Sequence, residues 1–135
     1  SGGWLAFQVP GNFSAPSHVL MRRQAASGKW HSRLDGVLRH EDAVSEPADY
    51  LALLLEAGFD ADAWETTYLH VLQGPDPVLE WVRGTGLRPV LAALEPQEAS
   101  EFETEYAEAL RHAYPAGPHG TVFPFRRIFC VARKR

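Results

Sequence analysis

Two shortages narrow the class of protein that this sequence can encode. It has one cysteine, Cys130, which cannot form a disulfide within the chain, so a disulfide-stapled secreted domain is excluded and a reducing, cytoplasmic location is predicted. Its longest uninterrupted apolar run, residues 51–55, is far too short to cross a bilayer. No charged-then-apolar signal segment opens the sequence, so no membrane partner is expected.

Positive charge is also scarce. Lysine and arginine number 13 against 17 acidic residues, which gives a formal net charge of −4. Nucleic-acid binding needs a broad basic field and is therefore excluded as a function. A small anion remains possible, because a few arginines that converge locally can bind it whatever the net charge. At 135 residues with 45% hydrophobic content, the sequence predicts one globular domain or part of one.

Motifs for several catalytic chemistries are missing. The six histidines form no H-x-x-x-H or H-x-H pair, so no metal site is predicted. No serine lies in a G-x-S-x-G elbow and no paired carboxylates stand out, so no catalytic residue is assigned. Residues 84–86, Gly-Thr-Gly, resemble half of a dinucleotide fingerprint, but they follow a predicted helix and lack the third glycine. We interpret them as a hinge between helices.

The most informative stretch is a predicted strand near the C-terminus, residues 125–132. It is apolar at both parities from Ile128 to Ala132, a pattern typical of a central strand that is covered on both faces. Residues 4–9 and 63–72 are its predicted neighbours, so the first and last strands are expected to pair. Cys130 is then a small core residue, and the basic end of the chain is expected to lie in solvent.

Helices are predicted between these strands. One runs over residues 16–24 and puts His18 and Arg22, four positions apart, on one face. Residues 29–46 are expected to form a surface loop with one helical turn. A second helix, residues 48–57, is expected to bury its whole leucine-rich stripe.

A helical insert, residues 73–120, separates the last two strands. Asp76 is predicted to cap its first helix, whereas Arg88 precedes a proline and is expected to be non-helical. The stripe that its longest helix is expected to bury consists of Phe102, Tyr106, Leu110 and Tyr114. The predicted fold class is therefore α/β, with a sheet portion in residues 1–72 and 121–135 and a helical cap in the insert.

Polar side chains gather at the ends of the predicted strands and at the joints of the cap. They are Gln8, Asn12, His18, Arg22, Tyr68, His70, Trp81, Thr85, Arg88, Arg126 and Arg127. Two or three converging arginines, with amide and hydroxyl donors, would bind carboxylates through bidentate hydrogen bonds. The residues alone leave three functions open: an enzyme, a non-catalytic domain that binds small polycarboxylates, and a structural interaction module.

Four stretches resemble trans-aconitate methyltransferases. They are Pro-Gly-Asn-Phe at 10–13 followed by Pro-Ser-His-Val-Leu-Met-Arg at 16–22, residues 50–59 running into Trp-Glu-Thr-Thr-Tyr at 64–68, residues 80–89, and residues 123–133. The most specific motif is Trp-Val-x-x-Thr-Gly-Leu-Arg-Pro at 81–89. Together they extend the resemblance over essentially the whole chain.

The resemblance implies a class I, Rossmann-like fold that moves a methyl group from S-adenosylmethionine to a carboxylate of trans-aconitate. It also implies that the glycine-rich cofactor loop lies in an N-terminal half that this sequence does not contain. The chain is then expected to be a C-terminal portion, made of a strand, a helix and an antiparallel hairpin with an inserted helical substrate cap. Alone, it is expected to be inactive and to self-associate through its unpaired first strand.

The resemblance further implies roles for individual residues. The expected substrate contacts are Arg88 and Arg127 as carboxylate clamps, Arg22 and His18 next to them, and Trp81, Thr85 and Tyr68 as the wall of the pocket. Asn12 is expected near the junction with the cofactor-binding half. No general base is needed, because a carboxylate is already ionised at neutral pH.

Overall fold

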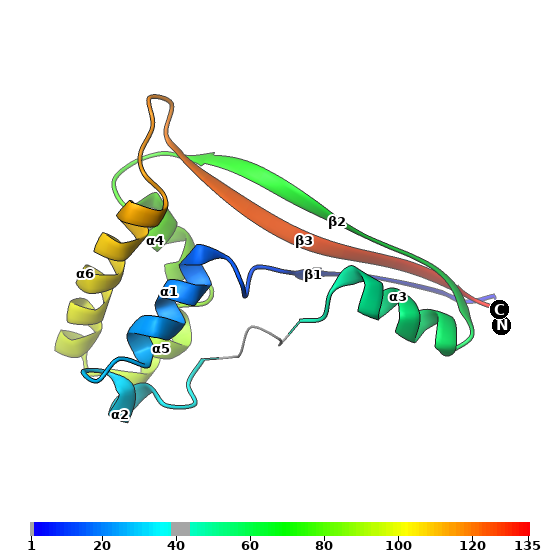
Figure 1. The fold of residues 1–135 in the computed structure, drawn as a ribbon, viewed down its shortest axis with the longest axis horizontal. Coiled ribbons are helices and arrows are strands. Elements are labelled where there is room, and N and C mark those ends of the chain that lie inside the picture. The colour runs from blue at the N-terminus through cyan, green and yellow to red at the C-terminus, as the bar shows by residue number, and fades with distance from the viewer. Residues whose placement is uncertain (1, 39–43) are drawn as a thin grey trace. The chain divides into compact units, whose positions relative to one another are not determined.

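The computed structural model describes residues 2–38 and 44–135. In chain order its elements are β1 (Trp4–Pro10), α1 (Pro16–Ala25), α2 (His31–Leu34), α3 (Pro47–Glu56), β2 (Phe59–Leu72), α4 (Pro77–Arg83), α5 (Arg88–Ala93), α6 (Pro96–Ala113) and β3 (Thr121–Lys134) (Figure 1). Every predicted strand and helix is present, so the α/β class is confirmed. Residues 39–43 of the predicted surface loop lie outside the described residues.

The chain divides into two compact units. The sheet unit consists of the described residues in Ser1–Phe13, Asp42–Tyr68 and Pro124–Arg135. The helical unit consists of those in Ser14–Glu41 and Leu69–Phe123. Strands β2 and β3 each begin in one unit and end in the other.

The three strands form one sheet in the order β1-β3-β2, so β3 is the central strand, as predicted. β1 pairs antiparallel with β3, from Trp4 opposite Arg133 to Pro10 opposite Arg127. Figure 1 shows these first and last strands side by side. The predicted meeting of the two strands is therefore confirmed, and β1 lies at an edge of the sheet.

The core of the sheet unit lies on one face of β3. Ile128, Cys130 and Ala132 are buried there and pack against Leu54 of α3. The alternate residues of β3 in this unit are only half-buried, so the expected cover on both faces is present on one face alone. The reason is that successive strand residues point to opposite faces of the sheet, and Leu54 of α3 packs against only one of these faces.

Helix α3 corrects a second expectation. Of its leucine-rich stripe only Leu54 is buried, while Leu53 is 59% exposed and Leu55 is 43% exposed. Consecutive helical residues point about 100° apart at 3.6 residues per turn, so three leucines in a row cannot all face the sheet. The C-terminal end of α3 receives Lys134, whose Nζ donates to the Ala57 carbonyl at 2.8 Å. The basic end of the chain is exposed as predicted, and it also supplies the positive charge that a helix C-terminus favours.

The helical unit is built around α6. Phe102, Tyr106 and Leu110 are buried on one stripe of this helix, as predicted, and α1, α4 and α5 contact it. Tyr114 follows the last turn and is half-buried. Trp30, which the sequence analysis did not place in the core, is fully buried with its ring 5.4 Å from that of Phe102.

Two local predictions in this unit are wrong. Asp76 makes no side-chain cap, because its φ of 49° is left-handed rather than extended, and its carboxylate binds Arg111 at 2.6 and 2.7 Å. Arg88 was expected outside the helical region but is the first residue of α5. Its backbone N–H donates to the Thr85 carbonyl at 3.3 Å, which winds the chain into the helix despite the following proline.

Candidate functional site

The break between α4 and α5, residues 84–87, is a closed turn, and we call it the glycine turn. The Thr85 hydroxyl donates to the carbonyls of Trp81 and Val82, each at 3.4 Å. The backbone N–H of Leu87, a fully buried residue, donates to the same Val82 carbonyl at 2.9 Å. Thr85, predicted to shape a pocket, therefore uses its hydroxyl hydrogen to close the turn.

His18 of α1 lies against the glycine turn, at Gly86. Its Nδ1 is 3.1 Å from the Ser17 hydroxyl. Burial, and secondarily the charge of Arg22, lower the pKa of the His18 imidazole below its ordinary value of 6.5. The lowered pKa favours the neutral form of the ring, in which one nitrogen can donate a hydrogen bond and the other can accept one.

Trp81 of α4 lies among aromatic side chains from other elements of the helical unit. Its ring centroid is 4.8 Å from that of His70 on β2 and 5.5 Å from that of Phe123 on β3. His70 was not among the predicted substrate contacts. The sequence could have indicated His70 as a neighbour of the predicted residues, because it follows Tyr68 by two positions and alternate strand residues share a face.

The two predicted arginines of the helical unit differ in exposure. Arg88 is exposed at the start of α5, whereas Arg22 is half-buried on α1 beside His18. Within this unit the structure brings His18, Arg22 and Gly86 together, and the hydroxyl of Thr85, next to Gly86, donates to the Trp81 carbonyl. This group of residues combines a guanidinium with an imidazole whose pKa is lowered.

The other predicted site residues belong to the sheet unit. Arg127 is half-buried on β3, with its guanidinium 5.1 Å from the centroid of the Phe125 ring. Tyr68 is exposed on β2. Asn12 is buried, and its amide bonds the backbone of Arg126 twice, donating to the carbonyl at 3.0 Å and accepting from the N–H at 2.8 Å. Asn12 therefore continues the pairing of the chain beyond the end of β1.

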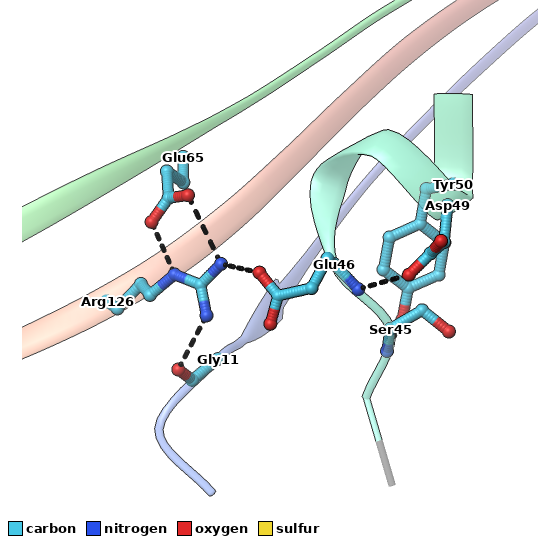
Figure 2. A network of polar contacts seen from close by, with 7 residues as sticks. All are labelled: Gly11, Ser45, Glu46, Asp49, Tyr50, Glu65 and Arg126. Carbon is cyan, nitrogen blue, oxygen red and sulfur yellow. Dashed lines mark hydrogen bonds and ion pairs between the residues drawn. The ribbon is translucent and has the colours of Figure 1, made fainter. Parts of the chain in front are cut away.

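Arg126, next to Arg127, is held by carboxylates of its own unit (Figure 2). It donates to both carboxylate oxygens of Glu65 on β2 and, at 2.6 Å, to Glu46, which precedes α3. A third contact joins it to the Gly11 carbonyl at 3.3 Å. The hydrogen bonds to Glu65 and then Glu46 raise the pKa of the guanidinium above its ordinary value. This arginine is part of the internal packing of the sheet unit.

A cavity of about 390 Å³ lies elsewhere in the helical unit. Its walls come from residues 74–79, the end of α6, the segment after it and the start of β3. Its charged groups are Asp76 and Arg111, which bind each other. None of the predicted substrate residues lines this cavity.

Neither a metal-binding cluster nor a membrane-spanning helix occurs in the part of the chain that the structure describes. No group of three or more histidine, cysteine, aspartate or glutamate side chains in residues 2–38 and 44–135 is arranged to hold a metal ion. In the same part of the chain, no helix combines the length and the apolar character needed to span a membrane.

Over nearly its whole length the chain is similar to curated proteins named trans-aconitate 2-methyltransferase. It is 64% identical over 133 residues to the protein from Streptomyces avermitilis, covering 98% of this chain and 49% of that protein. For the Streptomyces coelicolor protein the identity is 64% over 135 residues, with 98% and 45% covered. For the Rhodococcus jostii protein it is 53% over 135 residues, with 98% and 53% covered. No family model matches the chain.

The predicted resemblance to trans-aconitate methyltransferases is thus confirmed. The chain spans about half the length of the curated relatives it matches, in agreement with the predicted correspondence to a C-terminal portion of them.

Proposed function

From this similarity, we propose that the chain is the substrate-binding part of a methyltransferase that transfers the methyl group of S-adenosylmethionine to a carboxylate of trans-aconitate. The observation that carries the proposal is 64% identity, over 98% of the chain, to a protein named for this reaction. The proposal includes a Rossmann-like sheet portion in residues 1–72 and 121–135, a substrate cap in residues 73–120, and a cytoplasmic location. The free, buried thiol of Cys130 supports that location.

The main cofactor site belongs, in this proposal, to residues outside the chain. The sequence has no G-x-G-x-x-G fingerprint after a strand. Asn12, the residue predicted near the cofactor, already uses its amide oxygen and nitrogen on the backbone of Arg126. The residues present therefore do not fit a complete S-adenosylmethionine site, and the chain alone is proposed to be inactive.

The task of this chain's residues is to bind and orient the substrate. A carboxylate with a pKa of about 4 is ionised at pH 7, so no general base is required for methyl transfer. Arginines that hold the other carboxylates of the substrate would fix the position of the reacting oxygen. The guanidiniums proposed for this task are those of Arg22 and Arg88 in the helical unit and, separately, that of Arg127 in the sheet unit.

A second candidate is a non-catalytic domain that binds small polycarboxylates. The same arginines favour it, because at least partly exposed guanidiniums can bind a carboxylate without any methyl donor. The two candidates predict the same trans-aconitate binding by this chain. They differ in whether the longer protein transfers a methyl group.

Titration calorimetry of the 135-residue chain tests the proposal. We expect heat on addition of trans-aconitate and none on addition of S-adenosylhomocysteine. Binding of S-adenosylhomocysteine would contradict the assignment of the cofactor site to residues outside the chain. Absence of trans-aconitate binding would refute the substrate-binding role and with it both candidates.

We also propose that the chain alone self-associates through β1. This edge strand carries Trp4, which is 70% exposed, and Leu5, which is 42% exposed. An edge strand with exposed apolar side chains offers unpaired backbone groups to another chain. Light scattering should give a mass well above 15.0 kDa, and a mass of 15.0 kDa at high concentration would reject the proposal.

A further inference from the structure

The two glycines of the glycine turn have different surroundings, although neither needs to be glycine for its backbone conformation. Neither Gly84 nor Gly86 has a positive φ. A Cβ atom at Gly84 would meet only the Trp81 carbonyl oxygen, at an ordinary 3.9 Å. The reason for a glycine at position 86 must therefore lie in what surrounds it.

Gly86 lies in contact with α1. A Cβ atom there would be 3.3 Å from Nε2 of His18, and 3.8 Å from both Cδ2 of that ring and Cε of Met21. The shortest of these distances is tighter than an ordinary van der Waals contact, so the imidazole would have to shift to admit a methyl group. The 3.8 Å distance to Met21 is an ordinary van der Waals contact, so the imidazole is the group that limits the space at Gly86.

The other side of the His18 ring is also fixed. Its Nδ1 bonds the hydroxyl of Ser17, a fully buried residue. The Ser17 backbone N–H donates to the Tyr114 hydroxyl at 3.0 Å, and the Ser17 carbonyl accepts from the Tyr106 hydroxyl at 2.7 Å. On one side of the imidazole lies Ser17, which Tyr106 of α6 and Tyr114 just after α6 hold in place. On the other side lies Gly86, which has no side chain.

We propose that Gly86 is a positioning residue for substrate binding, because its missing side chain lets the His18 imidazole lie against the glycine turn in the orientation that Ser17 sets. The proposal rests on the proposed function in one respect, namely that His18 contacts a substrate carboxylate. Gly86 then has a steric role, whereas the sequence predicts only a hinge at residues 84–86. The three residues form one device, in which Ser17 orients the ring and Gly86 accommodates it.

Gly86→Ala and Gly84→Ala form a matched pair that tests the proposal on the 135-residue chain. We expect Gly86→Ala to weaken trans-aconitate binding about tenfold, the effect of displacing one hydrogen bond to a charged group, and Gly84→Ala to leave it unchanged. In NMR titrations, Gly86→Ala should shift the His18 ring resonances and raise the His18 pKa toward its ordinary value, because the displaced ring loses burial. Equal affinities and equal His18 resonances in the two variants would overturn the proposal.

A double variant distinguishes displacement of His18 from general damage to the turn. In a His18→Ala background the space beside Gly86 is open, so Gly86→Ala should change neither affinity nor thermal stability further. If Gly86→Ala alone fails to fold, the double variant should fold again, and its failure to fold would overturn the proposal. If the unaltered chain does not bind trans-aconitate, the proposed function fails, while the His18 resonances still decide whether Gly86 positions the ring.

Discussion

The polar clusters of the two units show that similar sequence signals can have different consequences. In the sheet unit Arg126 is matched by two carboxylates, those of Glu65 and Glu46, and by a backbone carbonyl (Figure 2). In the helical unit the charge of Arg22 acts on a neutral imidazole and lowers the pKa of His18. The first cluster joins one guanidinium to two carboxylates, whereas the second places a guanidinium near an imidazole.

The difference depends on residues that are distant in sequence. The carboxylates that bind Arg126 come from positions 61 and 80 residues earlier in the chain. Sequence spacing alone cannot show whether an arginine meets such a partner, because the partner is brought in by the sheet and by α3. Adjacent arginines on one strand, Arg126 and Arg127, therefore require different interpretations.

The largest expected effect on stability comes from Arg126→Gln. This change should lower the free energy of unfolding by about 1–2 kcal/mol, because it removes the ion pairs with the partly exposed Glu65 and Glu46 and the hydrogen bond to the Gly11 carbonyl. Denaturant unfolding followed by circular dichroism measures the loss. Arg127→Gln serves as the neighbouring control and should stay within about 0.5 kcal/mol of the unaltered chain. Equal losses of unfolding free energy in the two variants would show that the contacts of Arg126 do not stabilise the fold more than those of Arg127.

Arg127 is expected to matter for substrate binding rather than for stability. Arg127→Gln and Arg88→Gln should each weaken trans-aconitate binding about tenfold or more, because each removes a charge-assisted hydrogen bond to a carboxylate. Calorimetry measures the change, with Arg23→Gln as a control at an exposed arginine of α1. An unchanged affinity in either variant would remove that arginine from the proposed substrate contacts.

Much of the fold could be predicted because the relevant signals are local or periodic. The apolar residues at both parities from Ile128 to Ala132 correctly indicated the central strand, and the 3.6-residue stripe on α6 correctly indicated its buried face. The helix signals failed where the outcome depends on a partner. Leu53 and Leu55 could not be placed without knowing which side of α3 meets the sheet. Asp76 has the right residue type for a cap but a backbone conformation that the sequence does not reveal.

The candidate site was less predictable for the same reason. The four-residue spacing of His18 and Arg22 correctly put them near each other. Nothing in the sequence indicates that Gly86 faces His18, or that Ser17 is anchored by two tyrosines of distant positions. Residues 84–86, Gly-Thr-Gly, resemble half of a dinucleotide fingerprint, whereas in the structure Gly86 contacts His18 of α1.

A smaller effect on stability is expected at the anchor of His18. Tyr106→Phe removes the hydroxyl that donates to the buried Ser17 carbonyl and should lower the free energy of unfolding by about 1 kcal/mol. It should also shift the His18 ring resonances, because Ser17 orients that ring. Tyr68→Phe, at an exposed tyrosine, provides the control. A destabilised Tyr106 variant with unchanged His18 resonances would separate the tyrosine from the orientation of the ring.

The smallest expected effect is a pH dependence that belongs to the helical cluster alone. The folded-state pKa of His18 is below the ordinary value of 6.5 that the unfolded chain has, so the unfolded state binds more protons as the pH falls. His18 therefore contributes stability that is fully present above pH 6.5 and is lost as the pH falls through its folded-state pKa.

His18→Gln should remove this part of the pH dependence, measured as the free energy of unfolding on either side of pH 6.5. Arg126, by contrast, keeps its charge throughout this range, so Arg126→Gln should lower stability equally at both pH values. If the His18 variant kept the pH dependence of the unaltered chain, burial of the His18 ring would not be the source of that dependence.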